Sequence, residues 1–509
     1  MGNHLFGAIR ENARQHEAVF IETLDRRVWT YGAMLDLSGR LASRLVALGV
    51  EPGDRVAVQV EKSPEVLALY LACLRVGAVY LPLNTAYTLA ELDYFVGDAE
   101  PRLVVGTPET ADGIRQLAER HSARLETLGD MGGGSLLDNI DQLDVEFPDV
   151  VRGPDDLAAI LYTSGTTGRS KGAMLTHDNL LSNALTLRDY WRFSAQDRLI
   201  HALPIFHTHG LFVACNVALL SGASMYFLPK FDAGQVLSLM PKSTCMMGVP
   251  TFYVRLLKHD GLNREAVAGM RLFISGSAPL LAETHESFKR RTGQVILERY
   301  GMTETNMNTS NPYEGERIAG TVGFPLPGIQ MRVTDPDSGT PVGIGETGMI
   351  EVKGPNVFKG YWRMPEKTEA EFTTDGFFIT GDLGKFDEAG YVHIVGRGKD
   401  LVISGGYNIY PKEVETEIDQ LPGVVECAVI GVPHPDFGEG VVAVVVAKPG
   451  AEPDETGLLH RLKDRLARYK QPKRIVFIDD LPRNTMGKVQ KNRLRETYAG
   501  LFRDGKQDM

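Results

Sequence analysis

The chain has 509 residues, of which 43% are hydrophobic and 23% are charged. These fractions exclude a collagen-like or disordered chain, and the length predicts two to four domains. Lys and Arg number 54 against 65 Asp and Glu, which gives a formal net charge of −11, and no long basic run is present. We therefore expect no nucleic-acid partner, although a pocket can be cationic inside an acidic shell.

The cysteines indicate a reducing compartment. They are far apart and none forms a Cys-x-x-Cys pair, so neither a disulfide framework nor a zinc site is expected: Cys73, Cys215, Cys245 and Cys427. The sequence shows no signal peptide and no peroxisomal signal. We expect a cytoplasmic protein.

The first 150 residues alternate short apolar runs with helical patterns. Residues 55–60 read as a strand, Ser63 and Pro64 as a helix start, residues 67–74 as a buried helix and residues 78–81 as the next strand. Such a strand–helix–strand unit predicts a mainly parallel sheet. Further buried strands are expected at residues 103–105, 157–162, 272–274 and 295–297.

One apolar stretch tests whether the chain enters a membrane. Between Arg198 and Lys230 no Asp, Glu, Lys or Arg occurs, and this length could span a bilayer. The stretch also contains Pro204, Gly210 and three histidines. We interpret it as a strand end, a loop, a buried helix and another strand, and expect no membrane partner.

From about residue 328 the elements become shorter. Hairpin-like strands are predicted at 330–334 and 348–353, with a turn at 335–339. After Lys399 the pattern becomes α+β, with strands at 426–432, 441–447 and 474–478 and helices at 412–420 and 455–468. The predicted fold class is α/β. Residues 1–398 form a large domain of mainly parallel sheets flanked by helices, with a small β-barrel-like part, and residues 399–509 form a small mobile domain.

The clearest chemical signal is Tyr162-Thr-Ser-Gly-Thr-Thr-Gly-Arg-Ser-Lys171-Gly172, directly after a predicted strand. Its glycines let the backbone turn tightly, so that backbone N–H groups can surround phosphate oxygens. Hydroxyl side chains add donors and Lys171 adds charge. The loop is not a Walker A motif, because Arg and Ser follow Gly168.

On this loop the chain resembles the adenylate-forming superfamily, which includes the acyl-CoA synthetases. Six further motifs follow in order: residues 274–279, 298–304, 380–382, 396–397, 404–406 and 482–488. Within the superfamily the chain is most similar to bacterial malonyl-CoA synthetases. The resemblance implies that a carboxylate attacks the α-phosphorus of ATP, and that CoA then displaces AMP from the acyl-adenylate.

The same resemblance assigns roles to residues of this chain. Glu304, helped by Thr163, would bind Mg²⁺, and Thr303 would donate to the α-phosphate. Lys488 would stabilise the charge that develops at the α-phosphate. The full predicted ATP site is Thr163, Ser164, Gly165, Thr166, Thr167, Gly168, Lys171, Gly276, Ser277, Ala278, Glu298, Tyr300, Thr303, Asp382, Arg397 and Lys488.

The remaining roles concern CoA and domain motion. Lys399 matches the hinge about which the small domain would rotate between the half-reactions. Ser404, Gly405 and Gly406 would then line the CoA tunnel. Acylation of Lys488 by a lysine acyltransferase is a further expectation, because it would remove the charge on which adenylation depends.

Two arginines predict the acyl substrate. Arg255 and Arg299 near one small cavity would repel each other unless an anion bridges them, and a second carboxylate on the substrate would supply it. His207 would lie between the ATP and acyl sites. A metal held by His207 and His209 is not expected, because no third ligand is close in sequence.

Alternative functions remain open. The substrate could be methylmalonate, acetate or an aryl acid. A peptide-synthetase adenylation protein is disfavoured, because no carrier domain follows Met509. A regulatory ATP-binding protein would not need Lys488 together with Gly405 and Gly406. A luciferase-like oxygenase is compatible with the fold, but no residue favours it.

Overall fold

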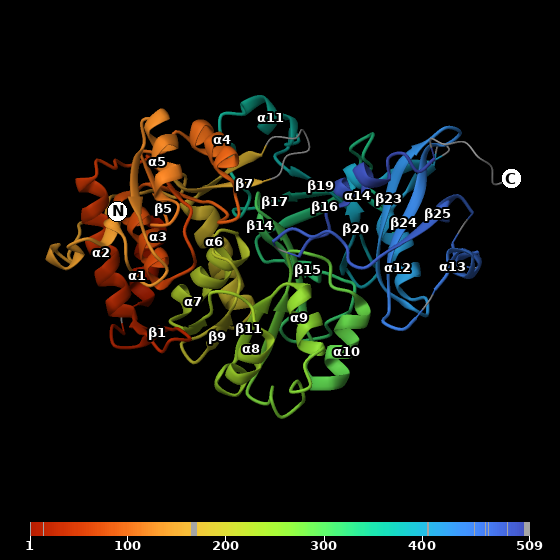
Figure 1. Ribbon diagram of the computed structural model, residues 1–509, viewed down its shortest axis with the longest axis horizontal. Helices are drawn as coiled ribbons and strands as arrows, with labels where there is room; N and C mark the ends of the chain where they lie inside the picture. The colour runs from red at the N-terminus through yellow and green to blue at the C-terminus, as the bar shows by residue number, and fades with distance from the viewer. Residues whose placement is uncertain are drawn as a thin grey trace. The chain divides into compact units, whose positions relative to one another are not determined.

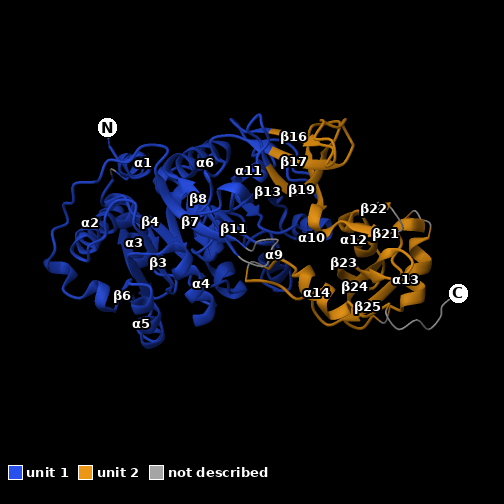
Figure 2. Ribbon diagram, turned by 90° about the horizontal axis from the view of Figure 1, so that it is seen from above, with its two compact units in different colours: residues 1–330, 352–378 blue, residues 331–351, 379–509 orange. Residues whose placement is uncertain are grey.

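The computed structural model describes residues 2–13, 15–163, 170–404, 407–451, 453–463, 465–466, 468–485 and 487–502. The chain forms two compact units (Figure 2). Unit 1 comprises residues 1–330 and 352–378, and unit 2 comprises residues 331–351 and 379–509. The predicted boundary at Lys399 stays a prediction, because these units group by packing and a hinge is defined by motion.

Unit 1 is built on two sheets (Figure 1). The seven-stranded sheet has the order β18-β8-β7-β4-β3-β5-β6 and is parallel from β7 to β6. Its strands are β3 Arg55–Val58, β4 Val79–Pro82, β5 Leu103–Gly106, β6 Arg124–Thr127, β7 Leu157–Thr163, β8 Lys171–Thr176 and β18 Gly360–Tyr361. Strands β8 and β18 run antiparallel to their neighbours.

The nine-stranded sheet has the order β15-β14-β13-β12-β11-β9-β10-β1-β2 and is parallel from β13 to β1. Its strands are β1 Val19–Glu22, β2 Val28–Thr30, β9 Arg198–His201, β10 Ser224–Phe227, β11 Cys245–Gly248, β12 Leu272–Ser275, β13 Leu297–Met302, β14 Asn306–Ser310 and β15 Phe324–Pro325. The predicted mainly parallel α/β architecture is confirmed.

Helices cover and separate the two sheets. Helix α6 contacts β8 of one sheet and β14 of the other, so it lies between them (Figure 1). Helices α4 and α5 pack on the seven-stranded sheet through one apolar cluster. The helices of unit 1 are α1 His4–Asn12, α2 Tyr31–Ala47, α3 Pro64–Val76, α4 Leu89–Ala99, α5 Ala111–Arg120, α6 His177–Tyr190, α7 Asn216–Ser221, α8 Ala233–Leu239, α9 Pro250–Leu257, α10 Ala282–Thr292 and α11 Pro365–Ala370.

Helix α3 begins and ends at residues that favour those positions. Ser63 accepts a hydrogen bond from the Val66 amide, Pro64 occupies the first helical position, and Gly77 ends the helix in the left-handed region at φ 73°. All thirteen residues of α3 are buried. The predicted strand–helix–strand unit is therefore confirmed, with its cap.

The apolar stretch after Arg198 folds as predicted. It forms the end of β9, a loop, a π-helix at His209–Cys215, helix α7 and strand β10. Among the described residues, no helix combines the length and apolarity that crossing a bilayer requires.

Unit 2 contains a four-stranded sheet and an α+β part. The first sheet has the order β16-β17-β19-β20, from strands β16 Gln330–Thr334, β17 Gly348–Lys353, β19 Phe378–Phe386 and β20 Val392–Arg397. The second joins β22 Tyr407–Ile409, β21 Val402–Ser404, β24 Gly438–Ala447, β23 Val424–His434 and β25 Arg474–Ile478. Its helices are α12 Pro411–Asp419, α13 Glu455–Leu462 and α14 Lys491–Tyr498.

Two predicted boundaries are wrong. The strand expected at residues 295–297 begins at Leu297, because the carbonyl of Val295 accepts a hydrogen bond from the Arg317 side chain instead of a neighbouring strand. The helix expected at 455–468 ends at Leu462. Downstream, the Leu466 carbonyl accepts from the side chain of Gln471 rather than from a continuing helix.

Candidate active site

The glycine-rich loop joins two paired strands. Strand β7 ends at Thr163, β8 begins at Lys171, and these two residues lie opposite each other in the antiparallel pair. The loop therefore leaves the carboxyl end of a buried strand, as predicted. Five of its predicted ATP-binding residues lie outside the described part of the chain: Ser164, Gly165, Thr166, Thr167 and Gly168.

Lys171 is held away from water by an ion pair. Its Nζ lies 3.0 Å from Glu371 Oε1 and 3.9 Å from the ring centroid of Tyr361. The residue is buried. A lysine at the start of β8 can thus supply positive charge beside the loop, and Glu371 balances that charge within unit 1.

Glu304 provides oxygen ligands beside the same loop. It lies just after β13 and is buried, and its Oε1 is 3.4 Å from Thr163 Oγ1 and 3.1 Å from the hydroxyl of Tyr361. A carboxylate with a nearby hydroxyl fits the oxygen ligands that Mg²⁺ prefers. Within the described residues, no group of three or more His, Cys, Asp or Glu side chains gathers as a metal site.

Five residues of the predicted ATP site lie on, or directly after, two adjacent parallel strands. Gly276, Ser277 and Ala278 follow β12, while Glu298 and Tyr300 belong to β13. Ser277 has a positive φ of 71°, which is uncommon outside glycine. The Glu298 carboxylate accepts a hydrogen bond of 3.0 Å from the amide of Leu280, which fixes this turn. Thr303 comes one residue after β13 ends.

Arg299 is a buried cation. Its side chain lies against the backbone of Gly276, where a Cβ would be 2.4 Å from Arg299 Cζ. The residue is 3% exposed, and its Nε and Nη2 atoms have no hydrogen-bond partner among the described residues. Burial lowers the pKa of Arg299 to about 9, while Tyr253 and Glu298 oppose that shift. Such a group can bind an anion strongly, because it lacks the water that would compete.

The second predicted arginine lies in a different environment. Arg255 is on α9, whose buried face carries Phe252, Tyr253 and Leu256, and it is itself exposed. Unlike the side chain of Arg299, that of Arg255 is therefore open to water. Its part in substrate binding stays a prediction.

His207, predicted between the ATP and acyl sites, and its neighbour His209 lie at the start of the π-helix, of which His209 is the first residue. Burial lowers the pKa of His207 to about 4, and holds the pKa of His209 well below its usual range. The Nε2 atoms of both are buried without a hydrogen-bond partner among the described residues, while Nδ1 of His209 lies 3.2 Å from Ser277 Oγ. Both rings are thus neutral near pH 7, which suits packing beside a substrate better than proton transfer.

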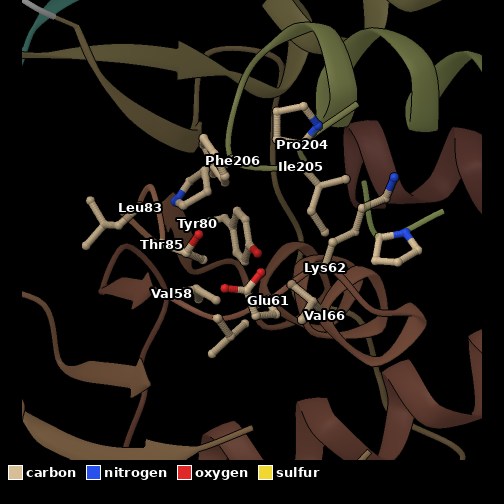
Figure 3. Close-up of a pocket in the computed structure, with 13 residues that line it drawn as sticks. Val58, Glu61, Lys62, Val66, Tyr80, Leu83, Thr85, Pro204, Ile205 and Phe206 are labelled. Atoms are coloured by element: carbon tan, nitrogen blue, oxygen red, sulfur yellow. The ribbon is translucent and has the colours of Figure 1, made fainter. Parts of the chain in front are cut away.

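A buried lysine holds the loop that carries these histidines. Lys62 Nζ lies 2.8 Å from His201 Nδ1 and donates to the carbonyls of His201 and Leu203, each at 2.9 Å. His201 Nε2 in turn lies 2.8 Å from the carbonyl of Gly210. Figure 3 shows Lys62 beside a small pocket that residues 204–206 of this loop also line.

The predicted residues of unit 2 include an ion pair. Arg397 Nε lies 2.7 Å from Asp382 Oδ1, between strands β20 and β19. Displacement of water lowers the pKa of Lys488, as do the charges of Arg397 and Lys399, while Asp382 opposes them. Ser404 is buried at the end of β21, and Lys399 is exposed. Gly405 and Gly406 lie outside the described residues.

Sequence reasoning missed three residues of this region. Tyr361 and Glu371 contact the Glu304 and Lys171 side chains, although both follow them by many residues along the chain. Lys62, between β3 and α3, donates to carbonyls of the segment that precedes His207. Nothing in a single sequence signals these contacts, because each depends on pairing between distant segments.

Comparison with known proteins identifies the family to which the chain is similar. Residues 9–362 match the model of the AMP-binding enzyme family, and residues 413–488 match that of the AMP-binding enzyme C-terminal domain. An ATP-bound crystal structure of MatB from Rhodopseudomonas palustris is 62% identical, with a TM-score of 0.97, and the match covers 99% of this chain and 100% of that one.

Curated relatives agree with this match. A feruloyl-CoA synthase of an Amycolatopsis species is 40% identical over 92% of this chain and 94% of its own length. A malonate–CoA ligase of Arabidopsis thaliana is 35% identical over 90% of this chain and 80% of its own length. The chain belongs to the AMP-binding enzyme family, the adenylate-forming superfamily that its motifs resemble.

Proposed function

We propose that the protein is an AMP-forming malonate–CoA ligase. In this reaction one malonate carboxylate attacks the α-phosphorus of ATP, the bond to pyrophosphate breaks, and malonyl-adenylate forms. The CoA thiol then attacks the activated carbonyl, loses its proton, and AMP leaves. The first step needs no nucleophile from the protein, since the substrate carboxylate is one; it needs positioning and charge stabilisation.

The environment of Arg299 is the observation that favours a dicarboxylate substrate. Its guanidinium is buried, and its Nε and Nη2 have no hydrogen-bond partner among the described residues. A second carboxylate on the substrate would supply the missing acceptors in bidentate geometry. A monocarboxylic or aryl acid would leave this cation uncompensated, at a cost of several kcal/mol.

The names of the relatives support malonate as the substrate, with an aryl acid as the alternative. The name malonate–CoA ligase is carried by relatives from Arabidopsis thaliana and Mus musculus, each 35% identical to this chain. The feruloyl-CoA synthase is more identical, at 40%. An aryl acid therefore stays the alternative to malonate, together with methylmalonate, and Arg299 favours the dicarboxylates.

The proposed roles follow from the charges of the site. Glu304 and Thr163 would hold Mg²⁺, which neutralises phosphate charge when it is bound. Thr303 and Lys171 would bind phosphate oxygens, and Asp382 would accept from the ribose hydroxyls. Neutral His207 would pack between the ATP and acyl sites.

The proposal extends to CoA, to compartment and to control. Ser404, Gly405 and Gly406 would line the path of the CoA thiol, with Lys399 as the hinge. Four buried, unpaired cysteines are compatible with a cytoplasmic enzyme. Acylation of Lys488 by a lysine acyltransferase would switch off the first half-reaction, because it removes the charge.

A substrate panel tests this function. CoA-dependent AMP release should be fastest with malonate, slower with methylmalonate, and at least about 100-fold lower in kcat/KM with acetate and ferulate. Arg299→Met should remove the preference for malonate over acetate, whereas Arg290→Met, on the exposed face of α10, should leave it intact. Arg255→Met decides whether Arg255 contributes. Equal rates with acetate and malonate would refute the assignment.

A further inference from the structure

Residues 358–368, which are distant in sequence, lie beside Glu304, the candidate metal ligand. Strand β18 pairs with β8 so that Tyr361 lies opposite Ala173, close to Lys171 at the start of β8. The amide of Phe358 donates to the backbone carbonyl of Glu304 at 2.8 Å. The amide of Tyr361 donates to Thr368 Oγ1 at 2.9 Å. Residues 358–368 are thereby fixed to the backbone of Glu304 and to α11.

The same segment also reaches the Glu304 side chain. The Tyr361 hydroxyl lies 3.1 Å from Glu304 Oε1 and 2.6 Å from Glu371 Oε2. Tyr361 is only 2% exposed, so water does not replace either contact. Glu371 is balanced by two lysines: Lys171 Nζ at 3.0 Å and Lys367 Nζ at 2.8 Å.

The Tyr361 hydroxyl has one hydrogen, so it can donate to only one of the two carboxylates at a time. The hydroxyl can donate to Glu304 Oε1 when Glu304 binds a cation, because Glu371 keeps the charges of Lys171 and Lys367. Without a cation, the hydrogen can instead lie on the shorter contact, to Glu371. In both cases the phenol oxygen limits the orientations open to the Glu304 carboxylate, and it does not neutralise the carboxylate.

We propose that Tyr361 is a positioning residue for the Mg²⁺-binding carboxylate of Glu304, anchored by Glu371. This inference rests on the proposed function, in which Glu304 holds Mg²⁺ with ATP. Partners that orient a metal ligand through hydrogen bonds typically contribute 10–100-fold to metal affinity. Tyr361→Phe removes the hydroxyl and keeps the ring that faces Lys171, so it isolates this contribution.

A matched control separates positioning from plain stability. Tyr31 is also a buried tyrosine of unit 1, and its hydroxyl contacts the carbonyls of Ala218 and Ala223 at 3.0 and 2.8 Å. Tyr31→Phe therefore loses two contacts of a buried phenol, as Tyr361→Phe does, without touching a carboxylate. A merely structural hydroxyl at 361 would make the two variants behave alike.

The experiment measures Mg²⁺ dependence in two ways. Calorimetric titration of each protein with a non-hydrolysable ATP analogue, at graded Mg²⁺ concentrations, gives the Mg²⁺ requirement of nucleotide binding without malonate or turnover. We expect Tyr361→Phe to need about tenfold more Mg²⁺ than the wild type, with unchanged binding in excess EDTA. Malonate-dependent ATP–pyrophosphate exchange should shift equally, while CoA transfer from supplied malonyl-adenylate stays within about twofold.

The outcomes are distinct. A tenfold Mg²⁺ shift in Tyr361→Phe but not in Tyr31→Phe supports the proposal, even if malonate proves to be the wrong substrate, because the binding measurement contains no acid. An unchanged Mg²⁺ requirement overturns it. Equal losses in Mg²⁺-dependent binding, EDTA binding and CoA transfer also overturn it, because they indicate a structural role.

Discussion

A single buried side chain, Arg299, links substrate choice to stability. Its Nε and Nη2 have no hydrogen-bond partner among the described residues, and its pKa is lowered to about 9 by burial. The folded protein therefore holds the cation less favourably than the unfolded chain does. An anion-binding site of this kind lowers the free energy of unfolding as long as no anion is bound.

Arg299→Met should therefore stabilise the protein while it removes malonate selectivity. We expect an increase of about 1–4 kcal/mol in the free energy of unfolding at pH 7, as when buried charges are replaced by apolar groups. Denaturant unfolding followed by tryptophan fluorescence measures it. Because burial lowers the folded pKa, the penalty is full below about pH 9, so the gain should stay constant across neutral pH.

At the scale of elements, the π-helix determines where His207 lies. A Cβ on Gly210 would be 1.9 Å from the carbonyl oxygen of Pro204, so the loop after β9 can close onto the helix only at a glycine. Lys62 and His201 hold the other end of this loop. The loop is thus fixed at both ends, and His207 lies between them.

Gly210→Ala should disrupt this loop. The clash is with backbone, which cannot rotate away, so we expect a loss of about 3 kcal/mol or more in stability, with reduced kcat/KM for malonate. Gly7→Ala in α1 is the control, because a Cβ at that position would have no neighbour within 4 Å and alanine favours helix. If Gly210→Ala unfolds at the wild-type midpoint, the loop is looser than its contacts indicate.

Local patterns were sufficient to predict many elements. The capped helix α3, the hairpin strand β17 and the strand β25 follow from caps, alternation and apolar runs that lie within a few residues. The start of β13 was wrong, because Arg317, twenty-two residues from Val295, takes that carbonyl. Tyr361 was not predicted because its position also depends on a contact between distant segments, the pairing of β18 with β8.

The candidate site was predictable to a different degree. Motifs identified Glu304, Lys171 and Arg299 by residue type and order. They could not indicate that Lys171 pairs with Glu371, or that Arg255 is exposed while Arg299 is buried. Burial is a property of the folded chain, and it distinguishes these two guanidinium groups, because Arg299 is buried and Arg255 is exposed.

At the scale of the whole molecule, the residues with proposed roles belong to two units. The loop, Glu304 and Arg299 belong to unit 1, whereas Asp382, Arg397 and Lys488 belong to unit 2. The net charge of −11 hides this distribution, since every proposed ligand is an anion. Under the proposed function, local cations would bind those anions, and residues of both units have such proposed roles.

The division predicts that the half-reactions can be separated by mutation. Lys488→Ala removes the cation proposed to stabilise charge at the α-phosphate, so malonate-dependent ATP–pyrophosphate exchange should fall by about 100-fold or more. Thioester formation from supplied malonyl-adenylate and CoA should stay near wild type. Lys463→Ala, at an exposed lysine of the same unit, should change neither rate.

Gly406→Leu should give the opposite result. A bulky side chain in the proposed CoA path would hinder the thiol and leave ATP and malonate free to react, so transfer from supplied adenylate should fall by at least about tenfold while exchange is retained. Rapid-quench assays of each half-reaction measure both rates. If the two variants lose both half-reactions equally, the two steps share one arrangement of residues, and the proposed rotation about Lys399 has no support.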